Sequence, residues 1–362
     1  MAAMRRLVPG ALATALLVGA CEKSTAPTTT DPTTMATAVS GMSSTLMQNS
    51  ALISLNALLY TPGFAGAAMV AATAPAAQPG TAGGGGGATA ALRTASLMRS
   101  MALARPAALQ ALFPANILGK TFQWDATTVP PGYRIKDSTY TLPGAPAVPS
   151  NGVRFILYQV DTASGMPNPG LQTTGYVDLA DVSTAAANAL HIVVHVASGT
   201  AADYTISEVR TTTTLTLSTT GYVQDVLIGG PQINFDLNHA FTLADSSLAD
   251  TFDLSGNGAT VTMMTTVSAS GAEVFDWTFS KNGTVELVGS GTDTTFDAQV
   301  KLNGTLFAKI SGTPNAPTIT DANGNALTAT ETLALYQIVV GFYSVYWAGT
   351  YLVFAPGILL FG

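Results

Sequence analysis

Two of the three histidines in this chain are spaced as a metal-binding pair would be. His191 and His195 lie four residues apart, a spacing that places two imidazoles on one face of a helix and lets them share one ion. The residues between them are Ile-Val-Val, however, and β-branched residues favour a strand, in which four residues span about 13 Å. We therefore expect two histidines on one strand face and no metal site there.

The third histidine and the carboxylates could supply acid or base chemistry. His239 is in phase with Phe235, Leu237 and Phe241, so we expect it to be buried and held by a hydrogen bond. Carboxylates recur in two short groups, as they do in any acidic β-protein: Asp178 with Asp181, and Asp245 with Asp250 and Asp253. The sequence holds no Gly-x-Ser-x-Gly, Ser-x-x-Lys or His-Glu-x-x-His motif. We assign no catalytic residue and no cofactor site.

Two segments imitate the start of a calcium-binding loop. Residues 253–258 follow the loop's order of oxygen ligands, but Met264 stands where the loop needs a bidentate carboxylate. Residues 321–325 follow the same order of oxygen ligands. Ala326, however, stands at the position where a calcium loop has its glycine, and Thr332 stands at its last position, where a carboxylate is needed. We expect both to be hairpin turns closed by their own side chains, with calcium as the alternative, and we assign no metal ligand.

Cys21 is the only cysteine of the chain and ends a segment with the order of an export signal. Residues 1–6 carry two arginines, residues 7–18 are uncharged and mostly apolar, and small residues follow. The motif Val18-Gly19-Ala20-Cys21 resembles the lipobox of bacterial lipoprotein precursors. This resemblance implies that residues 1–20 are a signal peptide and that Cys21 is lipidated and anchors the chain in a membrane. A single cysteine in an exported chain fits a modification site better than a disulfide.

The resemblance also bears on location. In diderm lipoproteins an aspartate after the lipidated cysteine retains the protein in the inner membrane, and this chain has Glu22 there. We therefore expect an exported cell-envelope protein, with the outer membrane favoured over the inner one. The formal net charge of −7, without any cluster of lysine or arginine, argues against nucleic acid as a partner.

The composition and the local pattern divide the chain into segments. Charged residues make up only 10%, compared with about 25% in ordinary soluble domains, so the polar surface must consist mainly of Thr, Ser, Asn and Gln. Residues 21–34 are rich in Thr and Pro and read as a tether behind the lipidated cysteine. Residues 35–119 show apolar residues at helical spacing, interrupted by a Gly/Ala-rich loop that contains Gly83–Gly87.

Residues 120–328 alternate between apolar and polar side chains, as in half-buried strands. Asn-Gly dipeptides lie between these alternating segments, and this dipeptide readily adopts the positive backbone φ angles that tight hairpin turns require. We predict a mainly β fold in which an antiparallel meander forms a curved sheet or a partly open barrel, covered by N-terminal and C-terminal helices. The side chains expected on the buried face are Phe235, Leu237, Phe275, Trp277, Phe279, Phe296, Val300 and Leu306.

Residues 329–362 have a single charge, Glu331, and are apolar on every face of a helix. Such a segment needs burial on all sides. A helix over 331–347 would be about 25 Å long, shorter than the ~30 Å hydrocarbon layer. We predict an apolar helix and a following strand packed on the sheet, in preference to a membrane element.

The functional expectation is a membrane-anchored lipoprotein of the cell envelope, more plausibly non-catalytic than an enzyme. Its curved sheet would act as a scaffold or bind an apolar ligand or an envelope partner, because a large apolar sheet face must be covered. Thr-rich strands leave a surface adhesin or glycan-binding module as the alternative. An exported hydrolase and a lipid-facing barrel are weaker alternatives.

Overall fold

The computed structural model describes residues 31–59, 94–95, 98–99, 101, 111–128, 131–136, 144–159, 170, 173–226, 229–292, 294–313 and 316–361. The expected signal peptide, the lipidation site Cys21 and the loop with Gly83–Gly87 lie outside these residues. The described part of the chain is mostly β-structure, with helices towards both ends, as predicted.

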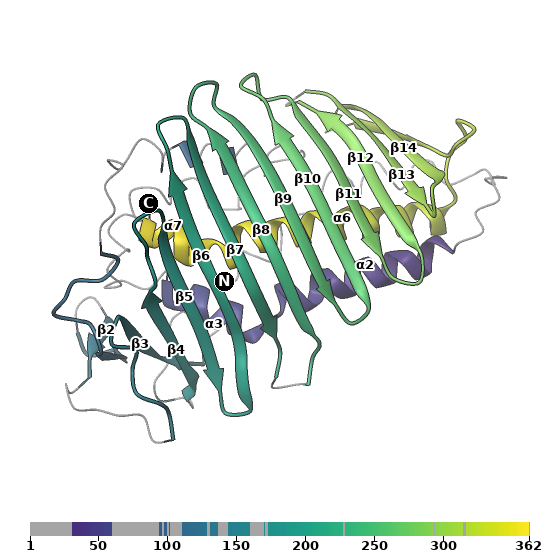
Figure 1. The fold of residues 1–362 in the computed structure, drawn as a ribbon. Coiled ribbons are helices and arrows are strands. Elements are labelled where there is room, and N and C mark those ends of the chain that lie inside the picture. Colours follow the sequence, from purple (N-terminus) through teal and green to yellow (C-terminus); the bar gives the residue numbers. More distant parts are fainter. Residues whose placement is uncertain are drawn as a thin grey trace.

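A single fifteen-stranded sheet dominates the fold (Figure 1). From β3 to β15 every strand pairs antiparallel with its neighbour in the chain, which confirms the meander. The sheet is open, with β15 and β2 at its two edges. It is not wholly antiparallel, because β1 pairs parallel with β3 before it pairs antiparallel with β2. The strands are β1 (Thr121–Asp125), β2 (Gly132–Ile135), β3 (Gly152–Tyr158), β4 (Thr173–Asp181), β5 (Asn188–Val196), β6 (Gly199–Arg210), β7 (Thr214–Gln224), β8 (Gln232–Thr242), β9 (Ser247–Gly256), β10 (Ala259–Val267), β11 (Glu273–Ser280), β12 (Thr284–Gly291), β13 (Phe296–Leu302), β14 (Thr305–Thr313) and β15 (Ala316–Thr320).

Alternation separates an apolar inner face of the sheet from a polar outer face. In β10 buried and exposed residues alternate without exception, and the neighbouring strands keep the same phase. Of the side chains expected inside, six are buried and Phe296 is partly buried. Leu306 was wrongly placed: a register shift between Val300 and Lys301 pairs Leu306 with Lys301, and Phe307 is buried instead. A bulge of this kind reverses the facing of the residues after it.

The hairpin turns use the predicted dipeptide. Asn257, Asn282 and Asn303 have φ angles of 52°, 54° and 49°, each followed by a glycine. Asparagine tolerates the left-handed region better than most residues, and such turns match the twist of the strands. Local sequence therefore sets these hairpin registers.

Two helical segments cross the inner face of the sheet (Figure 1). The first consists of α2 (Pro32–Met47) and α3 (Ser50–Leu59). Asp31 caps α2 and Pro32 occupies its first turn, so residues 32–34 belong to the helix and not to the expected tether. The break between α2 and α3 was not anticipated; there the Asn49 side chain accepts a hydrogen bond from the Leu52 amide.

The second segment consists of α6 (Ala329–Ala348), the π-helical turn η3 (Gly349–Val353) and α7 (Ala355–Phe361). Thr328 and Glu331 form a capping box at its start. The strand predicted after the helix in this tail is therefore wrong, because a π turn continues the helix into α7.

Glycines let these helices pack closely. A Cβ at Gly341 would lie 2.6 Å from a Val39 methyl carbon, so α6 contacts α2 there without a side chain between them. A Cβ at Gly349 would lie 2.8 Å from the Phe252 ring, where the helix touches the sheet. Among the described residues, no helix combines the length and apolarity that crossing a membrane requires.

Phe279 provides a test of the two-faced sheet, because its side chain is fully buried whereas Val274 on the same strand is 56% exposed. We expect Phe279→Ala to lower the free energy of unfolding by about 3–5 kcal/mol through loss of buried surface and formation of a cavity. Val274→Ala should change it by less than about 0.5 kcal/mol. The measurement is urea denaturation followed by circular dichroism, and similar losses for both variants would contradict the assigned facing.

Candidate functional site

His191 and His195 lie on one partly exposed face of β5 and do not converge on an ion. His191 Nε2 is 2.8 Å from Asp203 Oδ1, and both side chains are more than one-third exposed. The His195 ring stacks on Tyr176 at 4.7 Å between ring centroids, and its partial burial lowers the pKa of the imidazole. No group of three or more potential metal-ligating side chains occurs in the described ranges.

Asp178 and Asp181, which the sequence placed in one short group of carboxylates, have separate partners in the structure. The Asp178 carboxylate accepts two hydrogen bonds from the buried Arg154 guanidinium, at 2.6 and 2.7 Å. Arg154 also lies 4.1 Å from the centre of the Tyr176 ring and donates to the Pro146 carbonyl. Asp181 instead accepts from the amides of Leu112 and Ser183. Both aspartates therefore have structural partners.

His239 is buried on the inner face, as predicted, and belongs to a hydrogen-bonded chain of three side chains. Its Nδ1 lies 2.6 Å from Asp250 Oδ1, and both residues are at most 2% exposed. Tyr346 of α6 donates its hydroxyl hydrogen to the other Asp250 oxygen. Burial and the adjacent Asp250 raise the pKa of Tyr346 well above its usual value. This chain ties β8 and β9 to the helix that covers them.

A histidine oriented by an aspartate is the arrangement of a general base, but this one is enclosed. The His239 ring packs against Phe354 at 4.4 Å and Phe252 at 5.2 Å between centroids. Its free Nε2 is buried and has no hydrogen-bond partner. Because apolar rings surround the nitrogen that would take a proton, the geometry supports a structural role.

Glu273, at the start of β11, is a second inward-facing carboxylate. It is 2% exposed, and burial, with a smaller contribution from the negative charge of Asp250, raises its pKa to about 7. The charge of Glu273 in turn contributes to the raised pKa values of Tyr343 and Tyr346 on α6. Glu273 is therefore a carboxyl group whose protonation changes near neutral pH.

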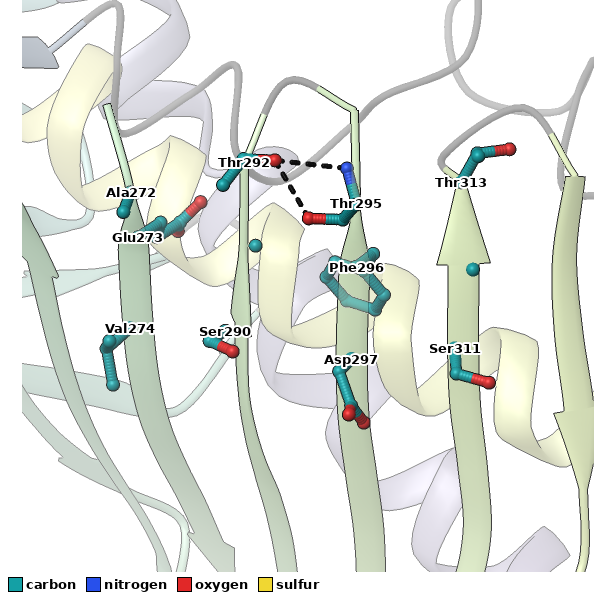
Figure 2. A pocket seen from close by; sticks show the side chains of 12 residues that line it. Ala272, Glu273, Val274, Ser290, Thr292, Thr295, Phe296, Asp297, Ser311 and Thr313 are labelled. Carbon is teal, nitrogen blue, oxygen red and sulfur yellow. Dashed lines mark hydrogen bonds between the residues drawn. The ribbon is translucent and has the colours of Figure 1, made fainter. Parts of the chain in front are cut away.

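Glu273 also lines a hollow at one rim of the sheet, where the ends of β11, β12, β13 and β14 meet (Figure 2). The hollow has a volume of about 510 Å³. Hydroxyl groups from Ser290, Thr292 and Thr313, the Phe296 ring and the Asp297 carboxylate contribute to its wall. We name this feature the rim hollow.

The segments that imitate calcium loops are turns. Asp321 Oδ1 accepts from the amides of Asn323 and Asn325, both at 2.8 Å, which closes an Asx-type turn before α6. Asn257 and Gly258 form the hairpin between β9 and β10. Asp253 lies on the outer face of β9, opposite Asp236 of β8.

Sequence reasoning named Asp250 only within a group of carboxylates and did not single out Glu273. A signal was present for both, because Asp250 shares its phase with Leu248 and Phe252, and Glu273 shares its phase with Phe275. A charged residue in the apolar phase of a strand must find a partner or shift its pKa.

Comparison with known proteins gives no relative. No family model, no curated protein and no solved structure matches this chain. The functional argument therefore rests on the geometry described above.

Glu273 makes stability depend on pH in a defined direction. Its pKa is raised in the folded protein, so stability is highest below the usual glutamate range and falls as pH rises through about 7. Glu273→Gln should therefore unfold like the parent protein at pH 4 but be more stable at pH 8, by on the order of 2–3 kcal/mol. Urea melts of both proteins at each pH test this, and a difference that does not vary with pH would contradict the burial of an uncompensated carboxyl group.

Proposed function

We propose that this protein is a non-catalytic lipoprotein of the cell envelope, anchored through Cys21, whose body binds an envelope partner through the outer face of its sheet. Cys21 lies a short distance before Asp31, which caps α2, the first helix that the structure describes. The lipobox resemblance supports the anchor, and Glu22 supports the outer membrane over the inner one.

The observation that carries the proposal is that helices already occupy the inner face of the sheet. Side chains of α6, among them Ile338, Phe342 and Tyr346, are fully buried against it. The Trp277 ring stacks on Tyr346 at 5.7 Å and meets the Tyr343 ring edge-on at 4.8 Å between centroids. Since the protein's own helices fill the place where an apolar ligand would lie, a partner outside the sheet is favoured over a carried ligand.

The outer face has the chemistry of a surface that binds a polar partner. Its exposed positions carry hydroxyl, amide and carboxylate groups on rows of adjacent strands, which present many hydrogen-bonding groups on a rigid frame. These positions include Asn234, Asp236, Thr251, Asp253, Thr260, Thr262, Asp276 and Asp297. A second candidate function, a glycan-binding or adhesion module, draws on the same observation, because sugars are bound largely through hydrogen bonds.

The non-catalytic part of the proposal rests on the enclosed histidine. Within the described ranges, His239 has the strongest general-base geometry, yet it is 1% exposed and surrounded by aromatic rings. Substrate could reach it only if α6 and η3 left the sheet.

Anchoring is tested by Cys21→Ala. We expect the parent protein to incorporate a clickable fatty-acid analogue and to sediment with membranes, and the variant to lose both properties. Retention of label and of membrane association by the variant would remove the anchor from the proposal.

The choice between a partner and an apolar ligand is tested with the same Cys21→Ala protein, which lacks the anchor. We expect no saturable binding of a fluorescent long-chain fatty acid, because the inner face is already covered. Stoichiometric binding at micromolar concentration would instead favour the apolar-ligand function. If the fatty acid does bind, Gly349→Ala locates its site. The added methyl group crowds Phe252, so this variant should weaken fatty-acid binding if the ligand lies beneath η3.

A further inference from the structure

The helical layer, formed by α2, α3, α6, η3 and α7, differs from the sheet in its charge. These elements contain a single charged residue, Glu331. Its carboxylate accepts hydrogen bonds from the Thr328 amide and hydroxyl, so it serves as a helix cap. The outer face of the sheet, by contrast, exposes carboxylates such as Asp236 and Asp253. About one residue in four is charged in ordinary soluble domains, so an uncharged layer is unusual for a surface that meets water.

Helix α6 carries an apolar and aromatic stripe on the side that faces away from the core. Its buried residues cover the opposite side of the helix. Leu333, at 57%, is the most exposed large apolar side chain among the described residues. Four residues that are exposed or partly exposed lie within about 60° of one another around the helix, and we name them the α6 stripe: Leu333, Tyr336, Val340 and Trp347.

The α6 stripe has the composition of a surface that meets the border between lipid and water. Tyrosine and tryptophan combine an apolar ring with a polar tip and are enriched at that border. The Trp347 ring contacts the Tyr351 ring of η3 at 5.6 Å between centroids, so the aromatic surface continues past the end of α6. Glu331 lies about 200° around the helix from Leu333, which keeps the charge away from the stripe. An uncharged apolar and aromatic face is typical of a helix that lies on a bilayer.

The α6 stripe begins at the same end of the molecule as α2. Both helices run in the same direction, because α3 and α7, which follow them in the chain, both contact β6 (Figure 1). The contact between Gly341 and Val39 sets how far one helix is shifted along the other. At 1.5 Å per residue, Leu333 lies about 12 Å before Gly341, and Pro32 lies about 10 Å before Val39. Leu333 is therefore level with the start of α2.

The chain between the expected anchor and α2 is short. Cys21 precedes Asp31, the cap of α2, by ten residues, and such a chain spans at most about 35 Å. A lipid at Cys21 would therefore hold the start of α2, and Leu333 beside it, close to the bilayer. Because anchoring raises the effective concentration of lipid at this end of the molecule, contact through a few side chains suffices.

We propose that the α6 stripe lies on the surface of the bilayer in which Cys21 is anchored. The helical layer then faces the lipid, and the polar outer face of the sheet faces away from it, where a partner can reach it. This orientation rests on the lipid anchor proposed above. It requires contact with the bilayer surface only, because the inner side of α6 remains packed on the sheet.

The experiment places one fluorophore on each face of the molecule. Cys21 is the only cysteine and its thiol is blocked when it is lipidated, so Leu333→Cys adds a single site for an environment-sensitive fluorophore. The matched control is Val274→Cys on the outer face, where the side chain is 56% exposed compared with 57% for Leu333. Both changes replace an exposed side chain, so both variants should fold. The mature lipidated proteins are reconstituted into phosphatidylcholine vesicles whose lipids carry a nitroxide near the headgroup end of one acyl chain.

We expect the fluorophore at residue 333 to emit at shorter wavelength in vesicles and to lose about half or more of its emission to the nitroxide. The reason is that an interfacial helix buries its apolar face about 5–10 Å into the boundary between headgroups and acyl chains. The fluorophore at residue 274 should show neither change. Adding phosphatidylglycerol should make no difference, because the α6 stripe contains no basic residue to attract an anionic lipid.

Flotation of the unsubstituted protein with the vesicles tests the anchor separately. If this protein floats but residue 333 is not quenched, or both positions are quenched equally, the anchor stands and the orientation is wrong. The orientation is also wrong if quenching requires phosphatidylglycerol. A shift at residue 333 that occurs without quenching and only at high protein density would mean that a second copy of the chain covers the stripe instead. If the unsubstituted protein does not float and Cys21 accepts the fluorophore, the anchor and the orientation both fail.

Discussion

The constraint on which the structure depends is the need to cover one apolar face of a very wide sheet. Alternation places rings such as Phe275, Trp277 and Phe279 on one side of strand after strand, and this surface cannot face water. Two helical segments from opposite ends of the chain meet this need by crossing the inner face. Their close contact at Gly341 makes them one layer, so the two ends of the chain depend on each other for burial.

Polar groups beneath that layer fix where the helix lies. Tyr346 reaches Asp250, which holds His239, so one hydrogen-bonded chain links α6 to two strands. Buried polar networks contribute little net stability, but they penalise every arrangement in which a member loses its partner. The network therefore selects one position of α6 among several that would bury its apolar surface equally well.

At the rim of the sheet, the inner face carries a carboxyl group outside the hydrogen-bonded network found at its centre. The ends of β11, β12, β13 and β14 form the rim hollow. Glu273 lies there at the start of β11, where its buried carboxyl group marks the border between the core and the surface. Burial keeps its pKa near 7, so its charge responds to small changes in its surroundings. His239, held by Asp250, belongs to the network that fixes the fold, whereas Glu273 is a buried carboxyl group at the edge of the core whose pKa is raised by burial.

The sequence by itself determined the strands, their facing and the hairpins, because a two-residue period and Asn-Gly turns such as Asn257-Gly258 act over a few neighbouring residues. It also required burial of the tail after Glu331. Only the tertiary structure decided that the tail continues through a π turn, that a bulge next to Leu306 turns this side chain outward, and that Tyr346 meets Asp250. The physical reason is range: local patterns set which side of a strand a residue faces, whereas contacts between a helix and a distant strand depend on how the whole layer packs.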